Sequence, residues 1–186
     1  MSNFTIHTEE TAPEGSKALL AASRKQNGML PNLHAVMAEA PGLLEAYQTI
    51  GKLFTQSSFT KDELTVVWQS INVEHSCHYC VPAHTAIAKS MKVGDEISDA
   101  LRNETPLPSP RLEALRTFTL AVVRDRGQVA EAELQAFFEA GYTKQQVFEV
   151  ILGLSQKVMS NYTNHFAQTP VDAPFQPFAW SKTAAK

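Results

Sequence analysis

The sequence lacks long hydrophobic runs, and it carries little excess charge of either sign. No apolar run approaches the roughly 18 residues that a membrane-spanning helix needs, so no membrane segment is expected. The first ten residues have neither the basic start nor the apolar core of a signal peptide, which makes the cytoplasm the expected compartment. A net charge of -3, spread along the chain, gives no reason to expect nucleic acid or an anionic membrane as a partner.

The sequence is also poor in cysteine, and its two cysteines are too few for a disulfide scaffold. In a reducing compartment, two closely spaced cysteines favour a redox or a metal-binding role. The remaining composition, 44% hydrophobic and 19% charged, is that of an ordinary globular protein. A length of 186 residues fits one domain, so residues 1–186 are expected to fold as a single unit.

Helical spacing of apolar residues predicts an all-α fold with no convincing strand. Thr60 with Glu63, and Thr143 with Gln146, have the pattern of a capping box at a helix start. The helix after Thr60 is predicted to bury one face, formed by Leu64, Val67, Trp68 and Ile71. The helix after Thr143 is predicted to bury the stripe Val147, Val150, Ile151, Leu154, Val158 and Tyr162. Further start and stop signals lie at Pro13, Asn27-Gly28, Pro31, Pro41, Asp95 and Ser109-Pro110.

The helical core is expected at about 41–168, and residues 169–186 have a different character. This tail is rich in proline and carries Phe175, Phe178 and Trp180. It is predicted to be an arm that lies on a surface instead of a helix. The surface can belong to a neighbouring subunit or to the chain itself, and the sequence leaves both open.

Reactive side chains are concentrated in residues 74–84, which hold both cysteines and three of the six histidines. Cys77 and Cys80 have the two-residue spacing of a dithiol that can close as a disulfide. Pro82 would break a hydrogen bond deep in a helix but is free in its first turn, so the sequence predicts a helix start around His78 to Cys80, or else a kink there. A helix start lowers the pKa of a thiol, which favours a thiolate here.

His84 follows Cys80 by four residues, the spacing that makes two side chains neighbours on a helix. At about 100° per residue, Cys77, Cys80 and His84 fall within a stripe of roughly 60°. His84 can therefore take the thiol proton of Cys80 or hold the thiolate as an ion pair. The residues alone predict a redox dithiol with its own base.

The same residues allow three alternatives to a redox dithiol. Zinc sites use the same cysteine spacing, and His75, His78, His84 and His165 are available to complete one. The usual second pair of ligands is absent and one helical turn cannot easily surround a metal, so no metal is expected. Two inert buried cysteines are a further alternative. Haem attachment needs a histidine directly after the second cysteine, where Val81 stands, and no cofactor is expected.

The order Cys77-x-x-Cys80-x-x-x-His84, between two helices, resembles the core of alkyl hydroperoxidase D (AhpD) in the carboxymuconolactone decarboxylase superfamily. The stretch 72–80 resembles the peroxidase-related branch of that superfamily, and the similarity extends to residues 160–165. The resemblance implies an all-α AhpD-like domain with the dithiol at the start of a helix in a helical hairpin. It also implies a homo-oligomer, commonly a dimer, trimer or hexamer.

The activity that the resemblance implies is that of a thiol peroxidase. In the family the second cysteine, here Cys80, attacks the peroxide and becomes a sulfenic acid. The first cysteine, here Cys77, resolves it as an intramolecular disulfide, which a thiol reductant then reduces. The expected partners are therefore a peroxide substrate and a thiol donor.

The chain departs from the family pattern in its carboxylates and histidines. The family keeps a proton-relay glutamate twelve residues before the first cysteine, where this chain has Thr65. Glu74 and Glu63 are the available carboxylates, with Glu74 slightly favoured. Tyr79 replaces the family's second histidine, and His78 lies one residue earlier. Both are expected at the substrate pocket.

Asn161 and His165 extend the apolar stripe of the last helix, either as a buried hydrogen-bonded pair or as one wall of the cleft. One of them is also predicted to approach the dithiol from the last helix. Two other functions remain open: a redox-sensing or interaction protein that uses the dithiol as a switch, and a lactone decarboxylase-like enzyme. The second needs no dithiol, so the cysteines argue against it.

Overall fold

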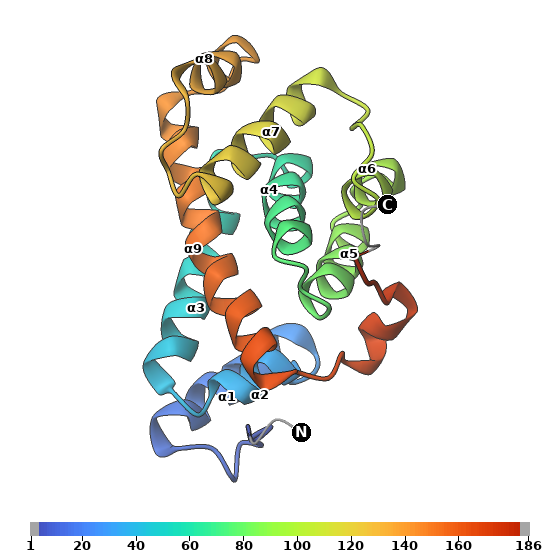
Figure 1. Cartoon of the computed structure of the whole chain (residues 1–186). Coiled ribbons are helices and arrows are strands. Elements are labelled where there is room, and N and C mark those ends of the chain that lie inside the picture. The colour runs from blue at the N-terminus through green and yellow to red at the C-terminus, as the bar shows by residue number, and fades with distance from the viewer. Residues whose placement is uncertain (1–3, 183–186) are drawn as a thin grey trace.

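The computed structural model describes residues 4–182, which form nine α-helices, one short 3-10 helix and no strand (Figure 1). The expected all-α fold is therefore confirmed for these residues. The helices are α1 Glu14–Asn27, α2 Asn32–Met37, α3 Pro41–Thr55, α4 Lys61–Glu74, α5 Cys80–Ser90, α6 Asp95–Arg102, α7 Pro110–Arg124, α8 Glu131–Glu139, α9 Lys144–Ala167 and the 3-10 helix η1 Ala173–Phe178. None of the described helices has the length and apolarity to cross a bilayer.

Helix α4 is the centre of the fold, since it packs against α5, α6, α7 and α9. Every residue from 63 to 73 is buried. The prediction of one buried face was therefore too narrow, because neighbours cover α4 on all sides. Helix α9 runs between α8 at one end of the molecule and α1 and α2 at the other (Figure 1).

Most predicted helix ends are confirmed. Both capping boxes form, at Thr60 with Glu63 and at Thr143 with Gln146. The first helix ends at Asn27, followed by Gly28 in the left-handed conformation with φ 71°. One signal was misplaced: Asp95 is the first residue of α6, and Gly94 precedes it without a side-chain cap.

The predicted apolar stripe of α9 is confirmed only in part. Val150 is buried, and Val147 and Leu154 pack half-buried against the core, whereas Ile151 and Tyr162 are 46% and 49% exposed. Apart from Val150, the buried positions of α9 carry small and polar side chains: Gln146, Gly153, Gln156, Lys157, Ser160, Asn161, Asn164 and Ala167. Periodicity missed these positions because it assumes that the interior-facing side of a helix is apolar.

The tail folds back on its own chain and packs beside α5 (Figure 1). It contains the short 3-10 helix η1, where the sequence predicts an arm without a helix, and residues 183–186 of that arm lie outside the described residues. Arg102 donates hydrogen bonds to the carbonyls of Phe178 (3.0 Å) and Ala179 (3.2 Å), and Trp180 Nε1 donates to the Arg102 carbonyl (3.0 Å). These bonds fix the tail to α6.

Two glycines allow α3 and α9 to pack closely. A Cβ atom on Gly153 would lie 2.8 Å from the ring of Phe54 and 3.0 Å from Val67. A Cβ atom on Gly51 would lie 2.6 Å from Gln156 Nε2. The close approach of α3 and α9 therefore depends on the lack of a side chain at Gly51 and Gly153.

We predict that Gly153→Ala lowers the free energy of unfolding by about 1–3 kcal/mol, because the methyl group overpacks the contact with Phe54. Gly42→Ala is the matched control, since no atom lies within 4 Å of its Cβ position in α3. That change is expected to be neutral or to add up to about 1 kcal/mol. Urea denaturation measures both. Equal stability of the two variants would contradict the close contact.

Candidate active site

The dithiol loop begins where α4 ends. Ser76 adopts the left-handed conformation with φ 54°, which is uncommon for a residue other than glycine. The next amide, of Cys77, donates to the carbonyl of Asn72 (2.9 Å), so the chain turns back against α4. Helix α5 then begins at Cys80, as the position of Pro82 predicted.

Both cysteines are free thiols and buried, Cys77 at 0% and Cys80 at 2% exposure. The backbone amide of Cys80 donates to Cys77 Sγ (3.3 Å). Asn164 Nδ2, from α9, donates to Cys80 Sγ (3.2 Å) and contacts Cys77 Sγ more weakly (3.9 Å). Helix α9 thus supplies a polar group to the sulfur at the start of α5.

A second group from α9 approaches α5 one turn beyond Cys80, at His84. Lys157 is completely buried, and its Nζ lies 2.6 Å from His84 Nε2. Because an ammonium group can only donate, Nε2 accepts this bond and the ring hydrogen is on Nδ1. That buried Nδ1 has no hydrogen-bond partner among the described residues. His84 also packs against Trp68, with 4.9 Å between ring centroids.

The surroundings separate the pKa values of the two thiols. Burial raises the pKa of Cys80, but the hydrogen bond from Cys77, the charge of Lys157 and the amides of Asn161 and Asn164 together lower it to about 6. The pKa of Cys77 is raised well above its ordinary value, by the bond to Cys80 and then by burial. Cys80 is therefore the thiolate near neutral pH, and Cys77 stays protonated.

Both basic groups beside Cys80, His84 and Lys157, have lowered pKa values. Burial, and then the charge of Lys157, lowers the pKa of His84 well below its ordinary value. Burial also lowers the pKa of Lys157, while the charges of Cys80 and Cys77 oppose that shift. His84 is therefore neutral, and the positive charge in this group belongs to Lys157.

A cavity of about 930 Å³ opens onto this group. Cys80, His84 and Lys157 line it, whereas Cys77 does not. The remaining wall is largely aromatic and aliphatic, and no aspartate or glutamate contributes to it: its apolar members include Leu33, Tyr47, Trp68, Ala83, Ile87 and Phe175. The volume is within the range of sites for small organic ligands.

Buried amide side chains hold the three helices around the dithiol. Asn161 Nδ2 donates to Asn72 Oδ1 (2.9 Å), and Asn72 Nδ2 donates to Gln69 Oε1 (3.0 Å). Gln69 in turn donates to the carbonyl of Val81 (3.1 Å). Asn161 also contacts His75 Nδ1 (2.9 Å). This chain of bonds connects α9, α4 and the first turn of α5.

His78 and Tyr79 hold the C-terminal tail. The exposed His78 donates from Nε2 to the carbonyl of Thr169 (3.0 Å). The Tyr79 hydroxyl donates to Asp172 and accepts from the amide of Leu33 (3.3 Å). Tyr79 lines the cavity and His78 does not. Both residues thus connect the dithiol loop to the tail.

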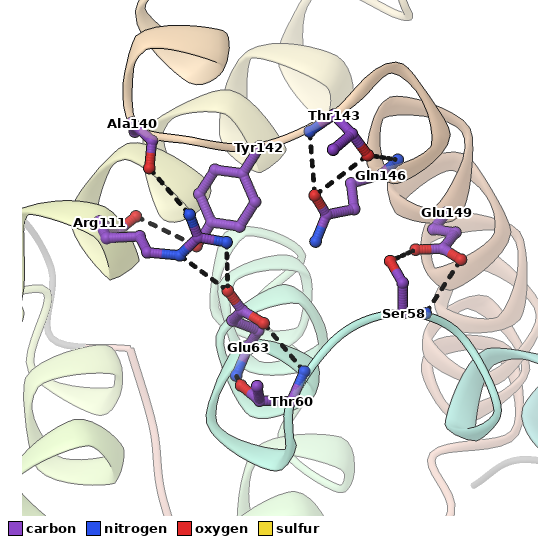
Figure 2. A network of polar contacts seen from close by, with 9 residues as sticks. All are labelled: Ser58, Thr60, Glu63, Arg111, Ala140, Tyr142, Thr143, Gln146 and Glu149. Atoms are coloured by element: carbon purple, nitrogen blue, oxygen red, sulfur yellow. Dashed lines mark hydrogen bonds and ion pairs between the residues drawn. The ribbon is translucent and has the colours of Figure 1, made fainter.

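The two predicted carboxylates have partners away from the cavity. Glu74 accepts two hydrogen bonds from Arg124, at 2.7 and 2.9 Å. Glu63 caps α4 and is bound by Arg111 at 3.1 and 3.2 Å, as Figure 2 shows. Neither lines the cavity. Their contacts are those of structural ion pairs.

Of the two candidates on α9, only Asn161 is buried beside the dithiol, and His165 is exposed. Sequence reasoning missed three residues of the site: Lys157, Asn164 and Tyr47. Burial, followed by the charges of the two cysteines, raises the pKa of the Tyr47 hydroxyl, which stays protonated. The missed signal was the 3–4 spacing of Gly153, Lys157, Asn161 and Asn164, which marks one small and polar face of a helix.

Among residues 4–182, no three His, Cys, Asp or Glu side chains are grouped so that they could hold a metal ion. The cysteines and His84 are surrounded by donors, the Asn164 amide and the Lys157 ammonium. Donors of this kind stabilise a thiolate and do not bind a cation.

We predict that one thiol of the reduced protein is alkylated by iodoacetamide with an apparent pKa of about 6. Because only the thiolate reacts, the rate rises as the pH passes upward through this value and is constant above it. Cys80→Ser is expected to remove this phase, because Cys77 stays protonated. A phase that persists in Cys80→Ser would assign the low pKa to Cys77.

Solved structures with the same architecture are known, although no protein-family model and no curated protein matches the chain. An uncharacterized peroxidase-related protein with an alkylhydroperoxidase AhpD core, from Ralstonia eutropha JMP134, has a TM-score of 0.83 at 21% identity, over 94% of each chain. An uncharacterized peroxidase-related protein from Silicibacter sp. TM1040 has a TM-score of 0.77 at 16% identity, over 93% of this chain and 92% of that one.

The debrominase Bmp8, solved with 2,3,4-tribromopyrrole, is also similar. Its TM-score is 0.79 at 15% identity, over 95% of each chain. These identities are too low to carry an activity across, but the agreement extends over nearly the whole length of each protein. The chain therefore has the AhpD-like fold that its dithiol motif led us to expect.

Proposed function

We propose that the protein is a thiol-dependent peroxidase that reduces organic hydroperoxides through Cys77 and Cys80. The observation that carries the proposal is the difference between the two sulfurs. Cys80 lines the cavity and has a pKa lowered to about 6, whereas Cys77 is outside the cavity wall with a raised pKa. A peroxide in the cavity can therefore contact the Cys80 thiolate directly, whereas the protonated Cys77 thiol lies outside the cavity wall.

The reaction proceeds in three balanced steps. The Cys80 thiolate attacks the terminal oxygen of ROOH, the O–O bond breaks, and a sulfenic acid and an alkoxide form. The Cys77 thiol then attacks the sulfenic sulfur, which gives the disulfide and releases water. Two equivalents of a thiol reductant return both cysteines to the reduced state and leave as a disulfide.

The size of the cavity favours a bulky organic substrate over hydrogen peroxide. A volume of about 930 Å³ is many times that of one water, whose share of the liquid is about 30 Å³. Four aromatic side chains belong to the wall: Tyr47, Trp68, Tyr79 and Phe175. Such a wall is suited to an aromatic or alkyl group next to the hydroperoxide.

A second candidate is thiol-dependent removal of bromine from an aromatic ring. The fold is shared with the debrominase Bmp8, and the aromatic wall of the cavity suits such a substrate. The dithiol would be oxidised to the disulfide, with bromine leaving as bromide and a proton taking its place on carbon. Bromide release from 2,3,4-tribromopyrrole, measured beside disulfide formation with cumene hydroperoxide, separates the two candidates.

We further propose that the protein acts as a homo-oligomer. Phe148 and Phe166 of α9 are 70% and 74% exposed, and Ile151 is 46% exposed. Exposed large apolar side chains on one helix are typical of an interaction surface.

The alternative in which the dithiol is a switch predicts one oxidation without turnover. A steady-state assay with a thiol reductant therefore distinguishes a sensor from an enzyme.

We predict that one equivalent of cumene hydroperoxide oxidises the reduced protein to a single Cys77–Cys80 disulfide. In Cys77→Ser the sulfenic acid of Cys80 has no resolving partner, so it accumulates and is trapped by dimedone. In Cys80→Ser no peroxide-dependent sulfenic acid is expected. Mass spectrometry of the labelled proteins measures all three. Trapping in Cys80→Ser instead would reverse the assignment, and no loss of thiol in the wild type would refute the proposal.

A further inference from the structure

The proposed peroxidase reaction creates a leaving group that needs a proton. An alkoxide is about as basic as hydroxide, so it is a poor leaving group unless it is protonated. A carboxylic acid is the expected donor, but Glu63 and Glu74 are bound to Arg111 and Arg124. No aspartate or glutamate lines the cavity. The proton must come from another group beside Cys80.

Lys157 is the group in the right place. It lines the same cavity as Cys80, and its charge acts directly on the Cys80 sulfur. It has no carboxylate partner within the described residues, because its hydrogen bond is to a neutral imidazole, His84 Nε2, at 2.6 Å. A fully buried lysine without a carboxylate is costly to keep charged, so it releases its proton readily.

We propose that Lys157 is the general acid that protonates the leaving alkoxide, and that His84 positions it. This inference rests on the proposed peroxidase function. As the O–O bond breaks, one N–H bond of the ammonium breaks and the alkoxide leaves as an alcohol, with Lys157 left as a neutral amine. When the thiol reductant restores the Cys80 thiolate, the proton released in that step returns to the amine.

The geometry gives His84 a different role from the one that the motif predicted. Nε2 accepts from Lys157, so His84 holds the amine at a fixed place. Neither ring nitrogen has a hydrogen bond to a cysteine sulfur among the described residues. Nδ1 is buried and has no hydrogen-bond partner among the described residues. His84 is thus a positioning residue, and Lys157 is the catalytic one.

The leaving group offers a direct test. Cumene hydroperoxide releases an alkoxide, whereas perbenzoic acid, a substrate of similar size, releases benzoate, whose conjugate acid has a pKa of about 4, as for other carboxylic acids. Only the first needs a proton donor. We therefore expect Lys157→Met to slow disulfide formation with cumene hydroperoxide about 100-fold or more, and with perbenzoic acid about 10-fold or less, in stopped-flow measurements at about pH 8.

A second variant separates proton donation from charge. Lys157→Arg keeps a positive charge beside Cys80, but arginine does not give up its proton in proteins. We expect it to keep the low pKa of Cys80 in the alkylation assay and still to lose rate selectively with cumene hydroperoxide. Lys144→Met, an exposed lysine at the start of the same helix, is the matched control and should leave both rates unchanged.

The outcomes are distinct. Equal losses with both oxidants in Lys157→Met and Lys157→Arg would overturn the proton-donor role and leave Lys157 with electrostatic stabilisation of the thiolate. A wild-type protein that oxidises no thiol with either peroxide would refute the peroxidase function, and this inference with it. A selective loss with cumene hydroperoxide in both variants supports the inference, because the perbenzoic acid rate reports an intact dithiol. A loss in Lys157→Met that Lys157→Arg fully restores would overturn the proton-donor role, because arginine supplies the charge without the proton.

Discussion

A positive charge buried at the centre of the molecule is the constraint on which the site depends. The ammonium group of Lys157 has lost its water, and in a protein interior such a charge needs a compensating partner. The partners within the described residues are the neutral ring of His84 and the dithiol sulfur at the start of α5. The ionisation of Cys80 and the position of Lys157 therefore stabilise each other.

This mutual stabilisation joins one local segment to a helix that is distant in sequence. The loop between α4 and α5 supplies Cys77, α5 supplies Cys80 and His84, and α9 supplies Lys157 and Asn164. The buried amides that connect Gln69, Asn72 and Asn161 keep these segments in register. Unpaired, each amide would cost roughly 1–3 kcal/mol, so the network favours one arrangement of the three helices over others.

The site residues that could be predicted from the sequence are those that lie close together in the chain. The cysteine spacing, Pro82 and the following histidine lie within one loop and one helical turn, where backbone geometry alone decides their relation. The donors from α9 lie about eighty residues further on, and their contacts depend on which face of that helix is packed inward. Apolar periodicity selected Val150 but missed the neighbouring buried positions, because these carry the polar groups of the site.

The carboxylates show the opposite error. Glu74 is three residues from Cys77, yet the turn at Ser76 directs the chain so that Glu74 pairs with Arg124 on α7. Nearness in sequence was a poor guide because one left-handed residue reverses the chain direction. The capping role of Glu63 was readable from its motif, whereas the bond from Arg111 joins residues 48 apart and was not.

The close contact at Gly153 determines where the buried charge is placed. This glycine lies four residues, or about 6 Å along the helix axis, before Lys157. A methyl group here would push α9 away from Phe54, and the helix would carry the ammonium with it. A displacement of about 1 Å is enough to change a catalytic rate severalfold or more. The alignment of the Lys157 amine with the Cys80 thiolate thus depends on the absence of a Cβ atom at Gly153.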